Sequence, residues 1–355
     1  MLHRAGHMGS LRSGAAGEGE AAMSHIETPY LMFLGDAKDQ LAAKTAAGVA
    51  HWRPDVCLGQ LRLEGCNADL GLPDMSLEEA REAGVRTLVI GVANRGGVIS
   101  EAWIDLLEQA LRLGFDLASG LHNKLADVPR LAELAAAEGR QLFDVRHPSQ
   151  SFEVGSGKKR SGKRLLAVGT DCSVGKMYAT LALEREMRAR GMAADFRATG
   201  QTGIFIVGDG VSVDAVVADF ISGAVEWLSP DNAPDHWDLV EGQGSLFHAS
   251  FAGVSMGLLH GAQPDALVLC HEPTRQHMRG LPHYPLPDLE ACIEANLVAA
   301  RLTNPEVVCI GAAINTAAIE PAAAEALLAE TADRLGMPVV DPVRSGVGAL
   351  IDALP

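Results

Sequence analysis

The chain has 355 residues, of which 48% are hydrophobic, with a formal net charge of −16 and an isoelectric point near 5.1. A chain of this length exceeds what one compact core usually organises, so we expect two globular domains. The acidic charge argues against a protein that binds nucleic acid or an anionic membrane, because such surfaces need clustered Lys and Arg.

Residues 1–22 are rich in Gly, Ala, Ser, Arg and Glu and show no hydrophobic period. We interpret them as a disordered or artificial extension outside the fold. No apolar run reaches the roughly 20 residues that a membrane-spanning helix needs, so we expect a cytoplasmic protein with no membrane partner. Six scattered cysteines show no C-x-x-C spacing, which favours reduced thiols and predicts no structural zinc site.

The region 29–150 alternates short apolar runs with helical stretches, a pattern typical of a parallel sheet covered by helices. We therefore predict an N-terminal Rossmann-like domain of the α/β class. Its predicted strands are 31–35, 56–61, 87–93, 115–119 and 141–145, and its predicted helices are 38–51, 77–83, 101–113 and 131–138.

Polar residues follow two strands of this first domain. Asn94 and Arg95 come after one strand, and Lys124 comes after another. In open α/β sheets, ligands bind at the carboxyl ends of strands, and Arg and Lys can bind carboxylates. Helix capping or surface solvation explains each of these residues equally well.

The segment 151–163 carries three glycines and four basic residues without an apolar period, and it predicts a linker or mobile loop. A second α/β series occupies 164–355 and predicts another parallel sheet. Its predicted strands are 165–169, 193–198, 238–241, 266–270, 306–314 and 338–341, and its predicted helices are 175–190, 212–228, 247–260, 288–302 and 320–335.

The second domain opens with an apolar strand, a glycine-containing turn, a lysine and a helix, which is the order of a P-loop. Backbone N–H groups in such a turn converge on an anion, and the helix dipole and the lysine add positive charge. The alternative is a structural glycine turn. The predicted phosphate-binding residues are Gly169, Thr170, Asp171, Cys172, Ser173, Val174, Gly175, Lys176 and Met177.

Met177 stands where a nucleoside triphosphatase places Ser or Thr to hold Mg²⁺, and a thioether is a poor ligand for that cation. The loop is therefore expected to bind phosphates without hydrolysing them, and no metal is predicted. Cys172 in this loop is a conceivable covalent acetyl carrier, although a buried thiol without a catalytic role is the commoner case.

Three further segments of the second domain are candidate ligand loops. Glu241 and His248 follow one strand and are candidate proton acceptors, unless Glu241 caps a helix and His248 lies on the surface. Thr199, Gln201 and Thr202 follow another strand, where a plain turn is the alternative. The proline-rich segment 272–288, which contains Arg275, cannot form a regular helix and is either a ligand loop or a structural connection.

Five motifs together resemble one known family. They are G-T-D-C-S-V-G-K-M at 169–177, R-A-T-G-Q-T-G at 197–203, V-D-A-V-V-A-D-F at 213–220, V-E-G-Q-G-S-L-F-H at 240–248 and V-R-S-G-V at 343–347. They are similar to those of the DgcN-type D-glutamate N-acetyltransferases, formerly known only as a domain of unknown function with a P-loop ATPase-like C-terminal domain. The likeness covers nearly all of 29–355.

The resemblance implies transfer of an acetyl group from acetyl-CoA to the amino group of D-glutamate. In that reading the P-loop holds the phosphates of CoA, Glu241 is the base, His248 assists it, and N–H groups around 242–244 stabilise the oxyanion. Arg95, Lys124 and Arg275 are the candidate partners of the substrate carboxylates. We expect small-molecule partners only, namely an amino acid and CoA, and a homo-oligomer.

Two other functions stay open on sequence alone. The spacing of the P-loop also resembles that of dethiobiotin synthetase, which suggests an ATP- or GTP-dependent ligase or kinase. A nucleotide-sensing protein, in which ligand binding shifts the two domains, is the third possibility.

Overall fold

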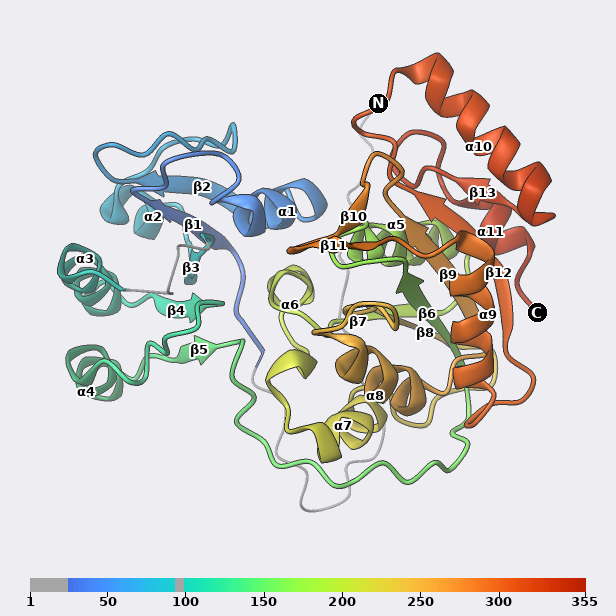
Figure 1. Cartoon of the computed structure of the whole chain (residues 1–355). Coiled ribbons are helices and arrows are strands. Elements are labelled where there is room, and N and C mark those ends of the chain that lie inside the picture. The colour runs from blue at the N-terminus through green and yellow to red at the C-terminus, as the bar shows by residue number, and fades with distance from the viewer. Residues whose placement is uncertain (1–24, 93–98) are drawn as a thin grey trace, which may run out of the picture.

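The computed structural model describes residues 25–92 and 99–355, so the predicted extension 1–22 lies outside the described residues. Two α/β halves stand side by side, each built around its own parallel sheet (Figure 1). None of the helices in the described ranges is both long and apolar enough to cross a membrane.

The N-terminal half holds a five-stranded parallel sheet with the strand order β2-β1-β3-β4-β5. Strand β1 is buried along its whole length, between β2 and β3. The elements are β1 (Tyr30–Gly35), α1 (Lys44–Trp52), β2 (Cys57–Arg62), α2 (Leu77–Glu82), β3 (Thr87–Ile90), α3 (Glu101–Arg112), β4 (Asp116–Ser119), α4 (Pro129–Glu138) and β5 (Leu142–Asp144).

The C-terminal half holds a six-stranded parallel sheet with the order β13-β12-β9-β6-β8-β7 and a two-stranded antiparallel hairpin, β10-β11. Its elements are β6 (Lys163–Gly169), α5 (Lys176–Ala189), β7 (Ala194–Arg197), α6 (Gln201–Val207), the 3₁₀ turns η2 (Val213–Ala215) and η3 (Ala218–Phe220), α7 (Ile221–Leu228), β8 (Trp237–Val240), α8 (Ala252–Ala262), β9 (Ala266–His271), β10 (His277–Met278), β11 (Leu281–Pro285), α9 (Leu289–Ala300), β12 (Val308–Ile314), α10 (Pro321–Leu335), β13 (Val339–Val340) and α11 (Gly348–Asp352).

Strand β6 shows why its sequence is apolar throughout. Leu166 and Val168 face a core shared with α7, α8 and α9, whereas Leu165 and Ala167 face a second core shared with α5 and α11. A strand covered by helices on both faces needs apolar side chains on both, unlike a half-exposed strand. The continuous apolar run before the P-loop is therefore explained by a doubly covered parallel sheet.

Helix α6 joins the two halves. Its residues Ile204, Phe205 and Ile206 are buried in the core of the N-terminal half, although they belong to the C-terminal half of the chain. The sequence predicted only a loop here. A seven-residue helix bounded by Gly200 and by Gly208, which has φ 86°, is too short to show a helical period, and its burial in the other half stabilises it.

Three other elements differ from their predictions. The predicted helix 212–228 contains two 3₁₀ turns before α7, and the N–H groups of Val211 and Val213 bond instead to the carbonyls of Ala198 and Thr199, which follow β7. Helix α8 begins at Ala252, five residues later than predicted, after a turn around His248. The proline-rich segment contains no helix, as predicted, but forms the hairpin β10-β11, whose edge strands tolerate proline.

The segment 151–163 runs along the outside of α7 and α8 (Figure 1). Glu226 of α7 accepts hydrogen bonds from the N–H groups of Ser156 and Gly157, and Arg160 donates to the carbonyl of Gly261. A side chain at Gly223 would collide with the Glu153 carbonyl, so this helix is shaped for the segment. Of the two predicted alternatives, a linker and a mobile loop, the contacts favour a linker that is held against the C-terminal half.

Candidate active site

The carboxyl edges of the two sheets face one another across α6. Gly120 follows β4 and packs so closely against Gln201, at the start of α6, that a side chain at Gly120 would clash with it. Helix α1 approaches the same region, because Gly48 lies against Thr202 and Met177. Ligand sites of open α/β sheets lie at such edges. The predicted ligand loops of the two halves therefore meet in one place.

The P-loop lies between β6 and α5, as predicted. Lys176 is buried, and its Nζ donates to the carbonyl oxygens of Asp171 and Gly244, each at 2.8 Å. Within the described residues, the N–H groups of Ser173, Val174 and Gly175 have no acceptor. Unpaired N–H groups at the start of a 14-residue helix form a site suited to phosphate.

Asp171 ties this loop to the hairpin. Its carboxylate is fully buried and accepts hydrogen bonds from Arg275 Nη1 at 2.6 Å and from the backbone N–H of Arg279 at 2.8 Å. Arg275 also donates to the carbonyls of Cys172 and Ser173. The predicted carboxylate-binding Arg275 thus has its charge occupied by a carboxylate of the chain itself.

His248 lies beside Asp171 and is buried, not on the surface. Its Nδ1 accepts from the Ser250 N–H at 3.2 Å, so its Nε2–H donates to the Arg279 carbonyl at 3.0 Å. With both nitrogens engaged, His248 positions the hairpin and offers no free lone pair in this arrangement.

Asp171, Cys172 and His248 place potential metal-ligand atoms within 4.8 Å of one another. The oxygens of Asp171 already accept from Arg275, Arg279 and the Cys172 N–H, at 2.6–2.8 Å. A cation at this position would have to displace these partners as well as those of His248. The group is better explained as a hydrogen-bond network than as a metal centre.

Glu241 directly follows β8 and is buried beside the P-loop lysine. Its Oε2 accepts from the N–H groups of Thr199 at 3.0 Å and Gly200 at 3.1 Å, and within the described residues its Oε1 has no hydrogen-bond partner. Burial raises the pKa of this carboxyl to about 7, against the lowering effect of the two N–H groups and of Lys176. A carboxyl group with this pKa changes its protonation state near neutral pH.

The glycines around Glu241 have a steric reason. A side chain at Gly203 would lie 2.5 Å from Glu241 Oε2, and one at Gly200 would meet the Gln243 amide at 2.6 Å. The T-G-Q-T-G sequence therefore leaves room for a carboxylate. Thr199 supports the same residue, since its hydroxyl donates to the Glu241 carbonyl at 2.6 Å.

Gln201 and Thr202 contact the other half of the molecule rather than Glu241. With its amide oriented to match its neighbours, Gln201 donates to the Gly120 carbonyl and accepts from Arg146 Nη2 at 3.2 Å. The Thr202 methyl group faces Gly48 of α1. Both side chains thus hold the facing edges together.

Cys172 and Met177 do not have reactive surroundings. Burial raises the pKa of the Cys172 thiol, which keeps it protonated at neutral pH and argues against a covalent carrier. Met177 is half-buried against the core of the N-terminal half and packs towards Gly48. The position that holds a metal-binding hydroxyl in nucleoside triphosphatases is here an apolar contact between the two halves.

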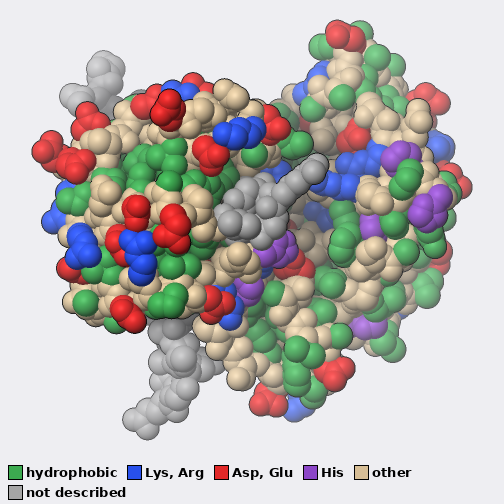
Figure 2. Space-filling model, turned by 60° about the vertical axis from the view of Figure 1, so that its left-hand side comes forward, with side chains coloured by type: hydrophobic (Ala, Val, Ile, Leu, Met, Phe, Trp, Pro, Cys, Tyr) green, Lys and Arg blue, Asp and Glu red, His purple; other side chains and the backbone are tan. Residues whose placement is uncertain are grey.

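Three cations that the sequence did not single out lie near one another at the facing edges. The pKa of Lys44, the first residue of α1, is lowered by partial burial and then by the charges of Arg279 and Arg146. Within the described residues Lys44 has no carboxylate partner. Figure 2 shows Lys and Arg side chains gathered beside the hollow between the two halves.

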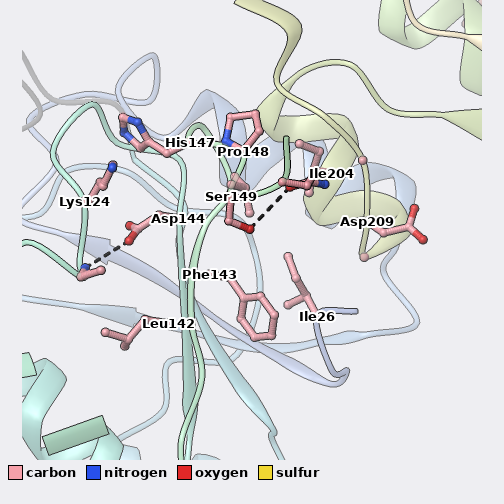
Figure 3. A pocket seen from close by; sticks show the side chains of 15 residues that line it. Ile26, Lys124, Leu142, Phe143, Asp144, His147, Pro148, Ser149, Ile204 and Asp209 are labelled. Carbon is pink, nitrogen blue, oxygen red and sulfur yellow. Dashed lines mark hydrogen bonds between the residues drawn. The ribbon is translucent and has the colours of Figure 1, made fainter. Parts of the chain in front are cut away.

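Of the predicted carboxylate partners in the N-terminal half, Asn94 and Arg95 lie outside the described residues. Lys124 lines a separate cavity of about 310 Å³ between β5 and α6, together with Asp144, His147 and Ile204 (Figure 3). Both oxygens of Asp144 accept backbone N–H groups there, from Leu125 and Ala126. The structure does not bring Lys124 to Glu241.

Comparison with known proteins identifies relatives over most of the chain. Residues 153–351 match a family model described as the P-loop domain of a domain of unknown function, DUF1611, and residues 61–148 match the Rossmann-like domain of the same family. A crystal structure of a DUF1611 family protein from Anabaena variabilis matches with a TM-score of 0.82 and 33% identity, covering 92% of this chain and 99% of that chain. The predicted Rossmann-like and P-loop α/β fold is confirmed.

Two curated relatives are each named D-glutamate N-acetyltransferase. One, from Tritonibacter scottomollicae, is 60% identical over 329 residues, which cover 93% of this chain and 99% of the relative. The other, from Pseudoalteromonas sp., is 49% identical over 326 residues, which cover 92% of this chain and 98% of the relative.

Proposed function

This chain belongs to the DUF1611 family, and we propose that it is an acyltransferase that moves the acetyl group of acetyl-CoA to the amino group of D-glutamate. The names of the two relatives support the reaction. The observation that carries it to this chain is Glu241, a buried carboxyl with a pKa of about 7 beside a phosphate-binding loop.

Acetyl transfer to an amine needs a proton acceptor, because an ammonium group has no lone pair. Ionised Glu241 accepts a proton from the ammonium at Oε1, while Oε2 stays fixed by Thr199 and Gly200. The amine then attacks the thioester carbonyl, an N–C bond forms and the C–S bond breaks. The CoA thiolate takes up the proton that the nitrogen loses as it becomes an amide, and Glu241 returns its own proton to solvent. Backbone N–H groups around 242–244 are the proposed oxyanion donors.

The P-loop suits CoA because it binds phosphate by N–H groups and Lys176, with no hydroxyl at Met177 for a magnesium ion. CoA carries a diphosphate but transfers no phosphoryl group, so a metal is not required for this chemistry. The protonated Cys172 thiol favours direct transfer within a ternary complex.

The two carboxylates of D-glutamate need cations, and Arg275 is already paired with Asp171. Lys44, Arg146 and Arg279 come from three separate segments of both halves and meet at the facing edges. We assign the substrate carboxylates to these cations. Arg146 also pairs with Asp214 at 2.9 Å, whereas Lys44 and Arg279 have no carboxylate partner within the described residues. Asn94 and Arg95 stay as further candidates, whereas Lys124 lines the separate cavity beside β5.

The test is product formation from D-glutamate and acetyl-CoA without ATP and in the presence of EDTA, followed by mass spectrometry and by the release of free thiol. N-acetyl-D-glutamate and CoA in equal amounts are expected. No product under these conditions, together with turnover of MgATP, would point to a ligase or kinase instead. Cytoplasmic location and a homo-oligomer stay predictions, which cell fractionation and light scattering test.

A further inference from the structure

A second cavity opens beside the P-loop. It has a volume of about 390 Å³ and is lined on one side by Gly175 and Tyr178, at the start of α5. The other side is formed by the residues after β12 and β13, among them Asn315, Val343 and Arg344. Because Gly175 belongs to both the P-loop and the cavity, the space is continuous with the proposed phosphate site.

Asp341 builds the far rim of the cavity. One oxygen of its carboxylate accepts from the N–H groups of Val343 at 2.8 Å and Arg344 at 3.0 Å. The other accepts from the N–H of Thr316 at 3.0 Å and from the Thr316 hydroxyl. Asp341 is buried, so this carboxylate joins the ends of two strands and is not available to a ligand.

The walls suit a flat, mostly apolar ring. Tyr178 stacks with His51 at a centroid distance of 5.6 Å and an interplanar angle of 28°. Val343 leaves 63% of its surface exposed at the rim. Asn315 uses its side-chain oxygen to accept from the Ala317 N–H, and its NH₂ group has no acceptor within the described residues. An apolar cavity with a spare amide donor fits a purine base.

Arg344 adds a charge that an adenine base alone does not need. It is the only Arg or Lys among the described residues that line the cavity. Its Nη2 donates to the Ile319 carbonyl at 2.8 Å, and within the described ranges it has no carboxylate partner. It lies in the V-R-S-G-V motif at 343–347, to which the proposed transfer gives no role.

We propose that this cavity holds the adenosine of coenzyme A and that Arg344 binds its 3′-phosphate. The inference rests on the proposed function, because CoA is the donor there. It also explains how the site distinguishes CoA from ADP: both carry adenine and a diphosphate, but only CoA carries a 3′-phosphate, and a guanidinium is well matched to a phosphate.

The test measures binding of CoA, dephospho-CoA and ADP by calorimetry to the full chain and to two variants, R344Q and the control R301Q. Arg301 is a half-exposed residue at the end of α9, outside the cavity lining. We expect the unmodified chain to prefer CoA over dephospho-CoA by about 10- to 100-fold, the range of a charge-assisted hydrogen bond. R344Q should lose that preference and keep its affinity for dephospho-CoA, while R301Q should bind as the unmodified chain does.

Equal affinity of the unmodified chain for CoA and dephospho-CoA would overturn the role of Arg344. The same conclusion follows if R344Q weakens the binding of CoA and dephospho-CoA by the same factor, since that outcome indicates that the segment around Arg344 is distorted. A317W narrows the cavity at its exposed rim and should weaken all three ligands; unchanged binding would show that the base lies elsewhere. If N-acetyl-D-glutamate forms but the binding measurements give these contrary results, only the assignment of the cavity and Arg344 is wrong. If CoA binds as expected but no product forms, only the proposed function is contradicted.

Discussion

Arg275 Nη1 lies 2.6 Å from Asp171 Oδ2, although 104 residues separate the two along the chain. Asp171 is fully buried, and only the side chain of Arg275 keeps some exposure, at 19%. The hairpin that carries Arg275 is thereby fixed over the P-loop, and the hydrogen bonds from Arg275 to the carbonyls of Cys172 and Ser173 orient the loop itself. The shape of the phosphate site therefore depends on a distant segment.

We expect R275A to destabilise the protein and weaken CoA binding. The substitution leaves the Asp171 carboxylate buried without its cation, and breaking a buried ion pair in this way costs about 3 kcal/mol or more. Urea unfolding measures the free energy of unfolding, and the KM for acetyl-CoA measures whether the P-loop keeps its ability to bind the coenzyme. R140A, which removes an arginine from the N-terminal half, serves as the matched control. An R275A protein with the stability and KM of the unmodified chain would show that the hairpin does not organise the loop.

E241Q tests the proposed general base. The raised pKa of Glu241, about 7, predicts that kcat/KM rises with pH through this value as the carboxyl ionises and becomes able to accept a proton. E241Q should lower kcat by about 10²- to 10⁴-fold, the usual contribution of general base catalysis, and should remove the inflection near pH 7. E241D keeps a carboxyl group and is the companion variant. An unchanged pH profile of kcat/KM in E241Q would show that the general base is a residue other than Glu241.

K44M tests the proposed partner of a substrate carboxylate. Loss of this cation should raise the KM for D-glutamate by about tenfold with little change in kcat, as expected when an interaction is made equally in the ground and transition states. The effect should shrink for D-glutamine, which lacks the side-chain carboxylate, if Lys44 binds that group. The KM for acetyl-CoA should stay constant. K38M is the control, because Lys38 is exposed and pairs with Asp36 on the same half. An equal rise in KM for D-glutamate and D-glutamine would indicate that Lys44 binds the α-carboxylate. No rise for either amino acid would exclude Lys44 as a substrate-binding residue.

Metal removal should leave the acetyl-transfer rate unchanged. Asp171 and His248 already have hydrogen-bond partners, and Met177 places a thioether rather than a hydroxyl after the lysine. The measurement compares rates after EDTA treatment and gel filtration with rates after addition of Mg²⁺ or Zn²⁺. A rate that falls with EDTA and returns with one cation would identify a metal at Asp171, Cys172 and His248.

The elements with a clear period were predictable from sequence. The doubly covered strand β6, the P-loop after it and the alternation of strands and helices follow from local patterns that tertiary contacts reinforce. Glu241 could also be predicted as a site residue, because an acidic residue that follows a strand and precedes glycines is a local sequence signal. How far its pKa is raised was not predictable, since that depends on burial by segments distant in the chain.

Long-range pairs account for what the sequence did not show. Arg275 looks like a free cation until the hairpin folds back onto Asp171, and His248 looks like a candidate base until Ser250 and Arg279 occupy its nitrogens. Lys44 carries no local signal, because a single cation in a helix is ordinary. Arg344 lies in the V-R-S-G-V motif, but the motif alone does not show which ligand it contacts. Lys44 reaches the other cations only because the edges of the two sheets face one another, and the Asp341 carboxylate positions the backbone of Arg344.

The raised pKa of Glu241 also has a consequence for stability. A carboxyl whose pKa is higher in the folded state than in the unfolded state stabilises the protein at low pH, and this contribution is lost as the pH rises from about 4.5 through about 7. At about 1.4 kcal/mol for each unit of pKa, ionised Glu241 costs up to about 3 kcal/mol above pH 7. E241Q, whose amide oxygen can still accept the N–H groups of Thr199 and Gly200, should therefore unfold at a higher temperature than the unmodified chain at pH 8. The difference should disappear near pH 5, and thermal unfolding followed by circular dichroism across this range measures it. If E241Q is less stable than the unmodified chain at pH 8, the folded protein must stabilise the ionised Glu241 carboxylate. The pKa of Glu241 would then not be raised to about 7, and its proposed role as general base would lose this support.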